Sequence, residues 1–268
     1  MGEPSLRYTK VSLFCGIPGI HFEYISGRNQ RHEYRNSQGD RYGPLRALIL
    51  NLDLHYGFDL DLEARIYSEK RITDSGFLLD PGPRQIERKP SGRTRHYHIE
   101  TVDTGKRRQM FGHTARRVKM RTTEKVEPQG DSPKTETDGW YIDPPAAWLR
   151  LYPQRAGFGY TCAVIGNLGE RDEVRFTRSG AHETGFPLIL ERRRDGRLEH
   201  RDKVIELSED TLDPGLFLPP EDFKPVPQLP SGPCVHRYSL GTRMRLRCLM
   251  LMDRPGRVGK KLGILGCS

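Results

Sequence analysis

The chain has no hydrophobic run that could cross a membrane as a helix. Such a helix needs about 18 or more consecutive apolar residues, and the most apolar stretch, Cys248 to Met252, has only five. The first twenty residues include one arginine and one lysine but no sustained apolar segment, so no signal peptide is visible. On these grounds alone the cytoplasm is the default expectation for the location of the chain.

Cysteine is scarce and scattered. The five cysteines, at positions 15, 162, 234, 248 and 267, form no C-x-x-C pair. This spacing argues against a zinc site and against a dense disulfide framework, although one bridge would be compatible with it. No metal ion and no other cofactor is expected from the sequence.

Motifs of catalysis are also absent. The sequence has no G-x-S-x-G nucleophile turn and no G-x-x-x-x-G-K-[ST] phosphate loop, and no cysteine carries a family signature. Ser179, His182 and Glu183 occur together in RSGAHETG, a segment more typical of a hairpin loop than of a catalytic triad. We therefore expect a protein that is not an enzyme.

Three histidines lie on or beside one expected hairpin. His96 and His98 are two apart on an expected strand, so both imidazoles face the same side, and His113 follows across the turn. Such a triad could bind zinc or another transition metal. Three arginines crowd the same region and would oppose a cation, so exposed strand histidines are the preferred interpretation.

The net charge of +9 is concentrated near the C-terminus. From Gln228 to Ser268 there are eight Lys/Arg and one acidic residue, a net of +7. Residues 1–227 then hold 36 basic and 34 acidic residues, a net of only +2. Six of the fifteen residues from Pro219 to Pro233 are proline, which predicts an extended linker before a basic tail.

Within this tail, three arginines alternate with apolar residues in TRMRLRCLMLM, which as a strand gives one cationic and one apolar face. An anionic membrane surface suits such a face, at about 1 kcal/mol for each basic residue near the lipid. Nucleic acid is the weaker alternative, because Tyr238 is the only aromatic residue available for base stacking. The preferred interpretation is an edge strand followed by a disordered, soluble C-terminus. The candidate contacts for an anionic surface are Arg243, Arg245, Arg247, Lys260 and Lys261.

Strict alternation marks the stretch from Arg46 to Tyr67. Every even position from Leu48 to Ile66 is apolar, and the odd positions from Asn51 on are mostly polar. A period of two predicts a strand with one buried face. We therefore expect the even residues on the core or concave face and the acidic residues in water.

The chain must turn or bend within this stretch, because an ordinary strand has about 5–6 residues. A three-residue loop ending on Gly57 would keep the even residues on one face. A continuous strand bent near Gly57, with the turn at Asp61–Ala64 where β-propensity is poor, would also do so. We prefer the second placement, with Ala64–Ile72 as the return strand.

The acidic residues of this stretch could be interpreted as a calcium site. Calcium needs six to eight oxygen ligands that converge from a loop, whereas an extended strand spreads carboxylates along a line. A solvated sheet face is therefore expected for the row formed by Asp53, Asp59, Asp61 and Glu63.

Further segments share the strand pattern, while helical periodicity is nearly absent. The segments are residues 94–103, 115–123, 137–143, 185–193 and 197–208. The first two flank the turn signal DTGK, and the last two flank the hairpin signal RDGR. The only helical candidates are short, around Pro145–Leu151 and in SEDTLDPGLF, where Ser208 could cap a turn.

These patterns predict a mainly β protein with one large, curved antiparallel sheet and few short helices. The expected organisation is an N-terminal segment of uncertain order at 1–24 and a β domain at 25–226. A proline-rich linker and the basic tail follow at 227–268. We find no internal repeat.

Four segments in a fixed order resemble a known family: TGKRRQMFGHTARRVKM, TDGWYID, TGFPLILE and LDPGLFLPPEDFKPV. With ILNLDLHYGFDLDLEARIYSE upstream, they are similar to an uncharacterised family of bacterial envelope proteins. That family is in turn similar to the outer-membrane lipoprotein carrier and sorting-protein superfamily. The matching features are Gly112–Arg116, Trp140, Gly185–Leu188 and Phe217–Phe223, over roughly residues 25–226.

The resemblance implies a half-barrel-like sheet whose concave face holds an acyl chain, and a place in the cell envelope. It implies no catalytic residue. The residues that would line the ligand, or equally form a core, are Trp140 and Ile142, which share one face of their strand, and Phe186, Leu188 and Leu190, which share one face of theirs. The leading hypothesis is a non-enzymatic protein that binds an apolar or lipid-like ligand. The alternatives are a polyanion-binding module that acts through the tail and a purely structural envelope protein.

Overall fold

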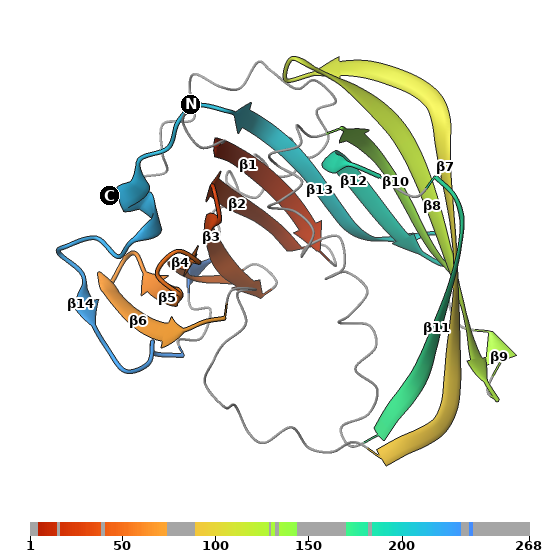
Figure 1. Cartoon of the computed structure of the whole chain (residues 1–268), viewed down its shortest axis with the longest axis horizontal. Coiled ribbons are helices and arrows are strands. Elements are labelled where there is room, and N and C mark those ends of the chain that lie inside the picture. The colour runs from red at the N-terminus through yellow and green to blue at the C-terminus, as the bar shows by residue number, and fades with distance from the viewer. Residues whose placement is uncertain are drawn as a thin grey trace. The chain divides into compact units, whose positions relative to one another are not determined.

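The computed structural model describes residues 5–14, 17–38, 41–73, 89–128, 130–131, 134–143, 170–181, 184–231 and 236–237. These residues form a mainly β protein whose strands pair largely in the antiparallel sense (Figure 1). The prediction of a mainly β protein built on a large antiparallel sheet is confirmed, while the half-barrel form remains a prediction. No helix in this part of the chain is long and apolar enough to cross a membrane.

The chain divides into two compact units. Unit 1 comprises residues 1–81 and 202–268, and unit 2 comprises residues 82–201. The expected organisation, with a β domain at 25–226 and a tail at 227–268, stays a prediction. Residues 5–14 and 17–26, most of which belong to the N-terminal segment expected at 1–24, form strands of unit 1.

The strands of unit 1 follow one another in space almost as they do in the chain. They are β1 (Ser5–Phe14), β2 (Ile17–Ser26), β3 (Asn29–Gln38), β4 (Arg41–Asn51), β5 (Tyr56–Asp61), β6 (Ile66–Arg71), β14 (Lys224–Pro225) and β15 (His236–Arg237). Strands β1 to β6 form an antiparallel meander. Strand β14 pairs in parallel with β6, and β15 pairs with β4. The rest of the tail lies outside the described residues, together with its five candidate contacts.

The alternating stretch folds into two hairpins rather than one bent strand. β4 and β5 are joined by the loop Leu52–His55, and β5 and β6 by Leu62–Arg65. The second loop confirms the turn predicted near Asp61–Ala64. The continuous strand through Gly57 is wrong, because Asn51 pairs with Tyr56 across the first loop.

A four-residue loop changes which parity is buried. In β4 the odd residues Ala47 and Ile49 are 1% and 0% exposed, and opposite them the even residues Phe58 and Leu60 are equally covered. The expectation that the even residues from Leu48 form the core is therefore wrong for β4. It holds for β5. A loop with an even number of residues places the odd-numbered residues of one strand opposite the even-numbered residues of the next, so both sets share one face.

The acidic row is not uniformly solvated either. Asp53 and Glu63 are exposed and Asp59 is half-buried, but Asp61 is only 4% exposed. The carboxylate of Asp61 accepts hydrogen bonds from the backbone N–H groups of Glu63 and Ala64, at 3.1 and 2.9 Å. Asp61 is therefore a turn residue, and its burial is compensated by the N–H groups of the loop that it begins.

The core of unit 1 is closed by the chain that follows β13. A short 3₁₀ helix, η2 (Pro214–Phe217), places Phe217 at 2% exposure against Ala47, Ile49, Phe58 and Leu60. The expected helix near this position is thus a single 3₁₀ turn, and its N-cap is Asp213 rather than Ser208. The other helical candidate, Pro145–Leu151, lies outside the described residues.

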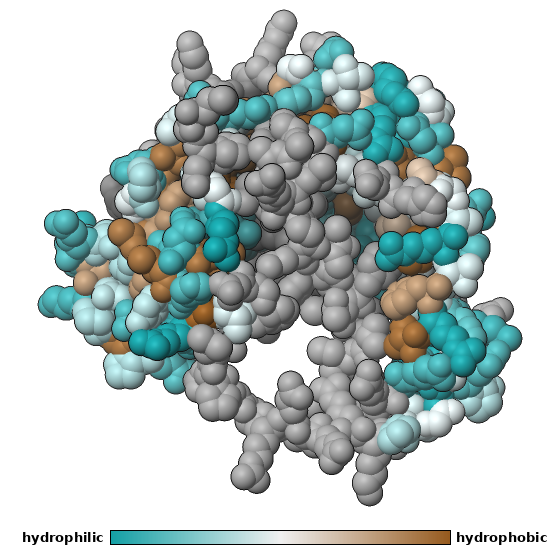
Figure 2. Space-filling model, viewed as in Figure 1, coloured by the Kyte–Doolittle hydropathy of each residue, from teal (hydrophilic) through white to brown (hydrophobic). Residues whose placement is uncertain are grey.

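The strands of unit 2 are longer. They are β7 (Lys89–Met110), β8 (His113–Glu127), β9 (Gly130–Asp131), β10 (Thr135–Ile142), β11 (Glu170–Gly180) and β12 (Phe186–Arg194). Their order is β11-β7-β8-β10-β12, with β9 beside β8 and only the β11–β7 pair parallel. Strand β13 (Arg197–Ser208) follows β12 through the hairpin turn Asp195–Gly196. In Figure 2 the visible surface of the described residues is mainly hydrophilic, with small groups of hydrophobic residues.

The signal DTGK is a bulge and not the turn of the β7–β8 hairpin. The turn is formed by Phe111 and Gly112, both with positive φ, as a two-residue hairpin loop requires. Three residues of β7, Thr104–Lys106, lie opposite the single residue Arg117 of β8. The predicted turn is therefore wrong, since β7 continues through the bulge and pairs with β8 on both sides of it.

The buried face of this hairpin changes at the bulge. Thr101 before the bulge and Met110 after it are 6% and 2% exposed, yet they point to opposite faces. On β8, Ala115 and Val118 are three residues apart without a bulge and are 0% and 1% exposed, so they too point to opposite faces. Each face of the hairpin is therefore buried along only part of its length. The face of Thr101 and Val118 is buried before the bulge, and the face of Met110 and Ala115 is buried between the bulge and the turn.

Candidate functional site

The five predicted lining residues lie on two neighbouring strands, β10 and β12. Ile142, Phe186 and Leu188 are 1%, 2% and 1% exposed, while Trp140 and Leu190 are half-buried. The structure therefore brings the five together in unit 2. Three of them are fully covered.

A β-bulge separates these residues between two faces. Trp140 pairs with Ile189, but the next residue of β10 pairs with Pro187, so Leu188 is an extra residue on β12. Ile142 then pairs with Phe186 on the face of Trp140, as predicted for Trp140 and Ile142. The prediction that Phe186, Leu188 and Leu190 share one face is wrong, because the bulge turns Leu190 to the opposite side.

Apolar side chains gather on the Trp140 face towards the β7–β8 turn. By strand alternation and pairing, this group comprises Met110, Ala115, Ile142 and Phe186, which we call the apolar patch. None of the four is more than 2% exposed. Sequence reasoning found Ile142 and Phe186 but missed Met110 and Ala115, because it placed the hairpin turn at DTGK.

Trp140 borders this patch and is flanked by two arginines. The guanidinium carbon of Arg108 lies 5.9 Å from the centre of the indole ring, a cation–π distance. Arg117, which is paired with Trp140 across the strands, donates from Nε and Nη2 to the two carboxylate oxygens of Asp138, at 2.8 and 2.6 Å. This bidentate contact raises the pKa of Arg117 above its usual value.

The bulge of β7 is fixed by short-range hydrogen bonds. The Thr104 hydroxyl donates to the carbonyl of Arg117 at 2.9 Å, and the N–H of Gly105 donates to Asp103 at 2.9 Å. Gly105 has φ +75°, a conformation that favours glycine. The bulge therefore holds a defined shape, and the next residue, Lys106, projects from it.

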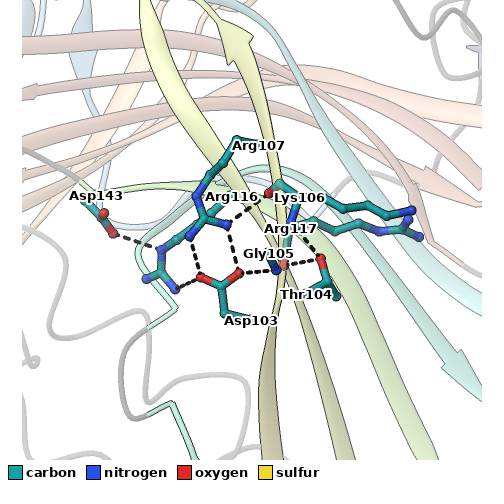
Figure 3. A network of polar contacts seen from close by, with 8 residues as sticks. All are labelled: Asp103, Thr104, Gly105, Lys106, Arg107, Arg116, Arg117 and Asp143. Carbon is teal, nitrogen blue, oxygen red and sulfur yellow. Dashed lines mark hydrogen bonds and ion pairs between the residues drawn. The ribbon is translucent and has the colours of Figure 1, made fainter.

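On the side away from Trp140 the charges balance. Asp103 accepts two hydrogen bonds from Arg107, at 2.9 and 3.0 Å, and Arg116 donates to Asp143 at 3.1 Å. The contact with Arg107 is the main reason that the pKa of Asp103 lies below its usual value. Figure 3 shows these four residues converging on one side of the hairpin, while Lys106 and Arg117 extend to the other.

The Trp140 side carries charges of both signs. Four cationic side chains share this face with the acids Asp138 and Glu191, which pair with each other across β10 and β12. Lys106 and Lys119 are exposed, and neither ammonium group has an ion-pair partner among the described residues. We call these four residues the basic collar: Lys106, Arg108, Arg117 and Lys119.

A second polar cluster lies in unit 1. Nδ1 of His21 and Nε2 of His32 are 3.0 Å apart, and the two rings are stacked with centroids separated by 5.3 Å. Glu23 pairs with His32 across the strands, with its Oε1 3.7 Å from His32 Nε2 and its side chain 3% exposed. The sequence signal, His-x-Glu on β2 opposite His-x-Tyr on β3, was missed because no strand was predicted before residue 46.

Burial gives His21 an acid-sensitive role in stability. Loss of hydration, helped by the charge of Lys10, lowers the pKa of His21 from 6.5 to about 4. Between these values the unfolded chain binds the proton and the folded chain does not, so stability falls as the pH drops from 6.5 towards 4. Urea unfolding should give a free energy about 1 kcal/mol lower at about pH 5.5 than at about pH 7.

The variant His21→Phe is the control for this expectation. It keeps an aromatic ring on β2 but removes the titrating group, so the difference between the two pH values should become smaller. An undiminished difference in the variant would show that another group causes it.

The third polar cluster joins the parallel strands β11 and β7. The carboxylate of Asp172, 1% exposed, accepts hydrogen bonds from Ser91, Arg93 and Arg95, at 2.5, 3.0 and 2.5 Å. Arg95 also donates to Glu124 on β8 at 2.6 Å. These contacts, those of Ser91 first, lower the pKa of Asp172 to about 2, so the carboxylate is ionised at neutral pH.

The three histidines considered as metal ligands do not converge. His96 pairs with Lys125 and lies 3.6 Å from Glu127, whereas His113 pairs with Met110 at the other end of the hairpin. Among the described residues, no group of three or more His, Cys, Asp or Glu could hold a metal ion. Ser179 belongs to β11, and His182 and Glu183 lie outside the described residues.

Comparison with known proteins adds little to this geometry. No family model matches the chain, and no curated protein matches it. Among solved structures the chain is similar to PNGF-II at 10% sequence identity and a TM-score of 0.30. That alignment covers 80% of this chain and 29% of the PNGF-II chain, so this chain spans less than a third of the other's length. A likeness of this extent assigns neither a fold family nor an activity.

Proposed function

We propose that this protein is a non-enzymatic binding protein that holds an apolar or lipid-like ligand on the sheet of unit 2, beside Trp140. The observation that carries the proposal is the apolar patch, which gathers side chains of four strands next to a half-buried tryptophan. Sites for small ligands typically combine an apolar lining with a few placed polar groups. The resemblance to lipoprotein carriers and a place in the cell envelope belong to the same proposal.

Burial of the patch sets a condition on binding. Because Met110, Ala115, Ile142 and Phe186 are at most 2% exposed, a ligand must take the place of protein atoms that now cover them. Such an exchange conserves apolar burial, since a hydrocarbon chain replaces side chains of similar character. If no ligand can take the place of the protein atoms that cover the patch, the four residues are part of the hydrophobic core, and the protein has a structural role.

The two tryptophans of the chain, Trp140 and Trp148, allow a direct test. The variant Trp148→Phe leaves Trp140 as the single tryptophan, whose fluorescence bromine atoms quench only at close range. Adding a fatty acid brominated along its chain should quench this fluorescence in a saturable way, and the same acid without bromine should relieve the quenching. The variant Trp140→Phe, which retains only Trp148, serves as the matched control.

Mass spectrometry of an organic extract from natively purified protein complements this titration. A stoichiometric lipid in the extract would support the proposal and identify the class of ligand. Absence of saturable quenching in Trp148→Phe, together with an empty extract, would refute ligand binding beside Trp140. The purely structural alternative would then be favoured.

A further inference from the structure

We infer that His21 and His32 form an acid-sensitive latch at the end of the β2–β3 ladder that lies away from its turn. The pair shares one proton between its facing ring nitrogens and separates when a second proton binds. This latch belongs to unit 1 and does not depend on the proposed function. It adds an order of protonation and a local opening to the acid sensitivity expected for His21.

The latch lies at the last paired residues of the two strands. Among the described residues, β2 pairs with β3 from Ser26, beside the turn at residues 27–28, to His21, which is opposite Tyr34. Strand β2 extends further, to Ile17, and pairs there with β1. The end of a ladder opens at a lower free energy than its middle. A side-chain contact at this position therefore sets how far β2 and β3 stay paired.

One hydrogen joins the two imidazoles. Nδ1 of His21 and Nε2 of His32 are 3.0 Å apart, so one nitrogen carries the hydrogen and the other accepts it through its lone pair. In the part of the chain that the structure describes, the pair belongs to no group of three or more potential metal ligands. The ligand that this geometry suits is therefore a proton.

The surroundings of His32 assign the first proton to it. Nε2 of His32 lies 3.7 Å from Oε1 of Glu23, whose side chain is 3% exposed. The ring of His32 also stacks on Tyr34, with the two centroids 4.9 Å apart. A buried carboxylate and an aromatic face both stabilise an imidazolium. The protonated Nε2 of His32 then donates to Nδ1 of His21, which stays neutral.

The surroundings of His21 oppose a second proton. Lys10 is opposite His21 on β1, and burial together with the charge of Lys10 lowers the pKa of His21 to about 4. The carboxylates of Glu23 and Asp202 act in the other direction, but Asp202 also lies 3.4 Å from the ammonium of Lys10. His21 therefore takes up a proton only after His32 has done so.

Other charged groups on this face of unit 1 are paired with one another. Strands β4 and β5 lie beyond β3, and there Arg46 is 3.3 Å from Asp61, while Lys70 of β6 is 3.9 Å from Asp59. The charged and titratable groups of this face are Tyr8, Lys10, Glu23, His32, Tyr34, Arg46, Asp59, Asp61, Lys70 and Asp202. The charge balance at His21 is thus set mainly by β1, β2, β3 and β13.

A second proton removes the acceptor from the pair. With a hydrogen on each facing nitrogen, two N–H groups and two positive charges would meet at 3.0 Å. Like charges at this separation repel strongly in a partly buried site. The rings must separate, and β2 and β3 lose the contact that closes the end of their ladder. Acid therefore opens the ladder from His21 and Tyr34 towards the turn.

NMR of the nitrogen nuclei in isotope-labelled histidines tests the order of protonation, with His21→Gln and His32→Gln to assign the signals. In a titration from about pH 8 to about pH 3.5, we expect His32 to bind its proton about tenfold more tightly than His21, or one pH unit apart. Between the two steps, Nδ1 of His21 should be the nitrogen without a hydrogen, because it accepts from His32.

Two variants separate the hydrogen bond from ring packing. His21→Phe keeps a ring but removes the acceptor, so the proton affinity of His32 should fall about fivefold. Tyr34→Phe keeps the aromatic face on His32 and is the matched control, with a change in that affinity within about twofold.

Hydrogen exchange locates the opening. The protection of each amide, relative to an unstructured peptide at the same pH, is compared at about pH 6 and about pH 4. We expect about a tenfold loss at the amides beside His21 and Tyr34, and less than about a twofold loss at Ser26 and Asn29 next to the turn. In His21→Phe the loss at the ladder end should disappear.

Each alternative outcome overturns a stated part of the latch. If the two histidines titrate within about twofold of each other, or if His21 takes the first proton, the shared proton is refuted. Equal loss of protection at both ends of the ladder would show that acid destabilises unit 1 as a whole, without a latch. A loss that persists in His21→Phe would assign the opening to another group.

Discussion

Replacing Phe217 with alanine is expected to lower the free energy of unfolding by about 3–5 kcal/mol. The phenyl ring is 2% exposed and packs with four buried side chains of β4 and β5. Its removal deletes buried hydrocarbon and leaves a cavity between the sheet and η2. Urea unfolding followed by circular dichroism measures the change.

The adjacent residue provides the control. Leu218 is 41% exposed, and Leu218→Ala should change the free energy of unfolding by no more than about 0.5 kcal/mol. Two hydrogen bonds to the η2 backbone, from Arg31 to the carbonyl of Leu216 and from Asn51 to that of Phe217, remain in both variants. A loss below about 1 kcal/mol for Phe217→Ala would show that this segment does not close the core.

Asp172→Asn is expected to cost about 3 kcal/mol of unfolding free energy. Removing one charge from a buried ion pair typically costs about 3–5 kcal/mol, and the lower end applies because Arg93 and Arg95 remain 20% and 21% exposed. An amide can still accept a hydrogen bond but does not neutralise the two guanidinium groups. The parallel pairing of β11 with β7 should therefore become the weakest part of unit 2.

The pH dependence of unfolding distinguishes an electrostatic contribution of the Asp172 carboxylate from a contribution of packing alone. Because the pKa of Asp172 is about 2 in the folded chain and about 3.9 when unfolded, its contribution is complete above about pH 4. The contribution is lost as the pH falls towards 2. The wild type should therefore lose stability over this range more steeply than Asp172→Asn.

Glu173→Gln changes the neighbouring, exposed carboxylate and is the matched control, with no measurable change expected. Equal acid sensitivity of Asp172→Asn and the wild type would contradict the assigned role. Hydrogen exchange of the β11 amides would then show which strand opens first.

The sequence predicted the strands and the turns that depend on local chemistry. The signal RDGR gave the correct hairpin, because Asp195 and Gly196 have φ of 49° and 79°, values that these residue types tolerate without help from the rest of the fold. Period-two alternation likewise located β4 to β6, since a pleated strand has two faces wherever it occurs. The strands at 5–14, 17–26 and 29–38 were not predicted.

Local sequence signals gave a wrong prediction where a hairpin turn and a bulge use the same residue types. DTGK contains a glycine with positive φ and an Asp that accepts a hydrogen bond from the backbone, which suits a hairpin turn and a bulge equally. Pairing with β8 on both sides of Thr104–Lys106 decides for the bulge. The candidate site depends on this outcome, because the bulge presents Lys106 and fixes the level at which the buried face changes.

By itself, the sequence determined that the protein is mainly β, that strands occur at 46–72, 94–143 and 185–208, and that Trp140 and Ile142 share a face. Only the tertiary structure decided which parity is buried in β4, which residues of β12 face Trp140, and where the cations gather. The reason is that alternation defines two faces but not which of them the rest of the chain covers. That choice depends on loop parity, on bulges, and on segments such as η2 that pack from about 160 residues away in the sequence.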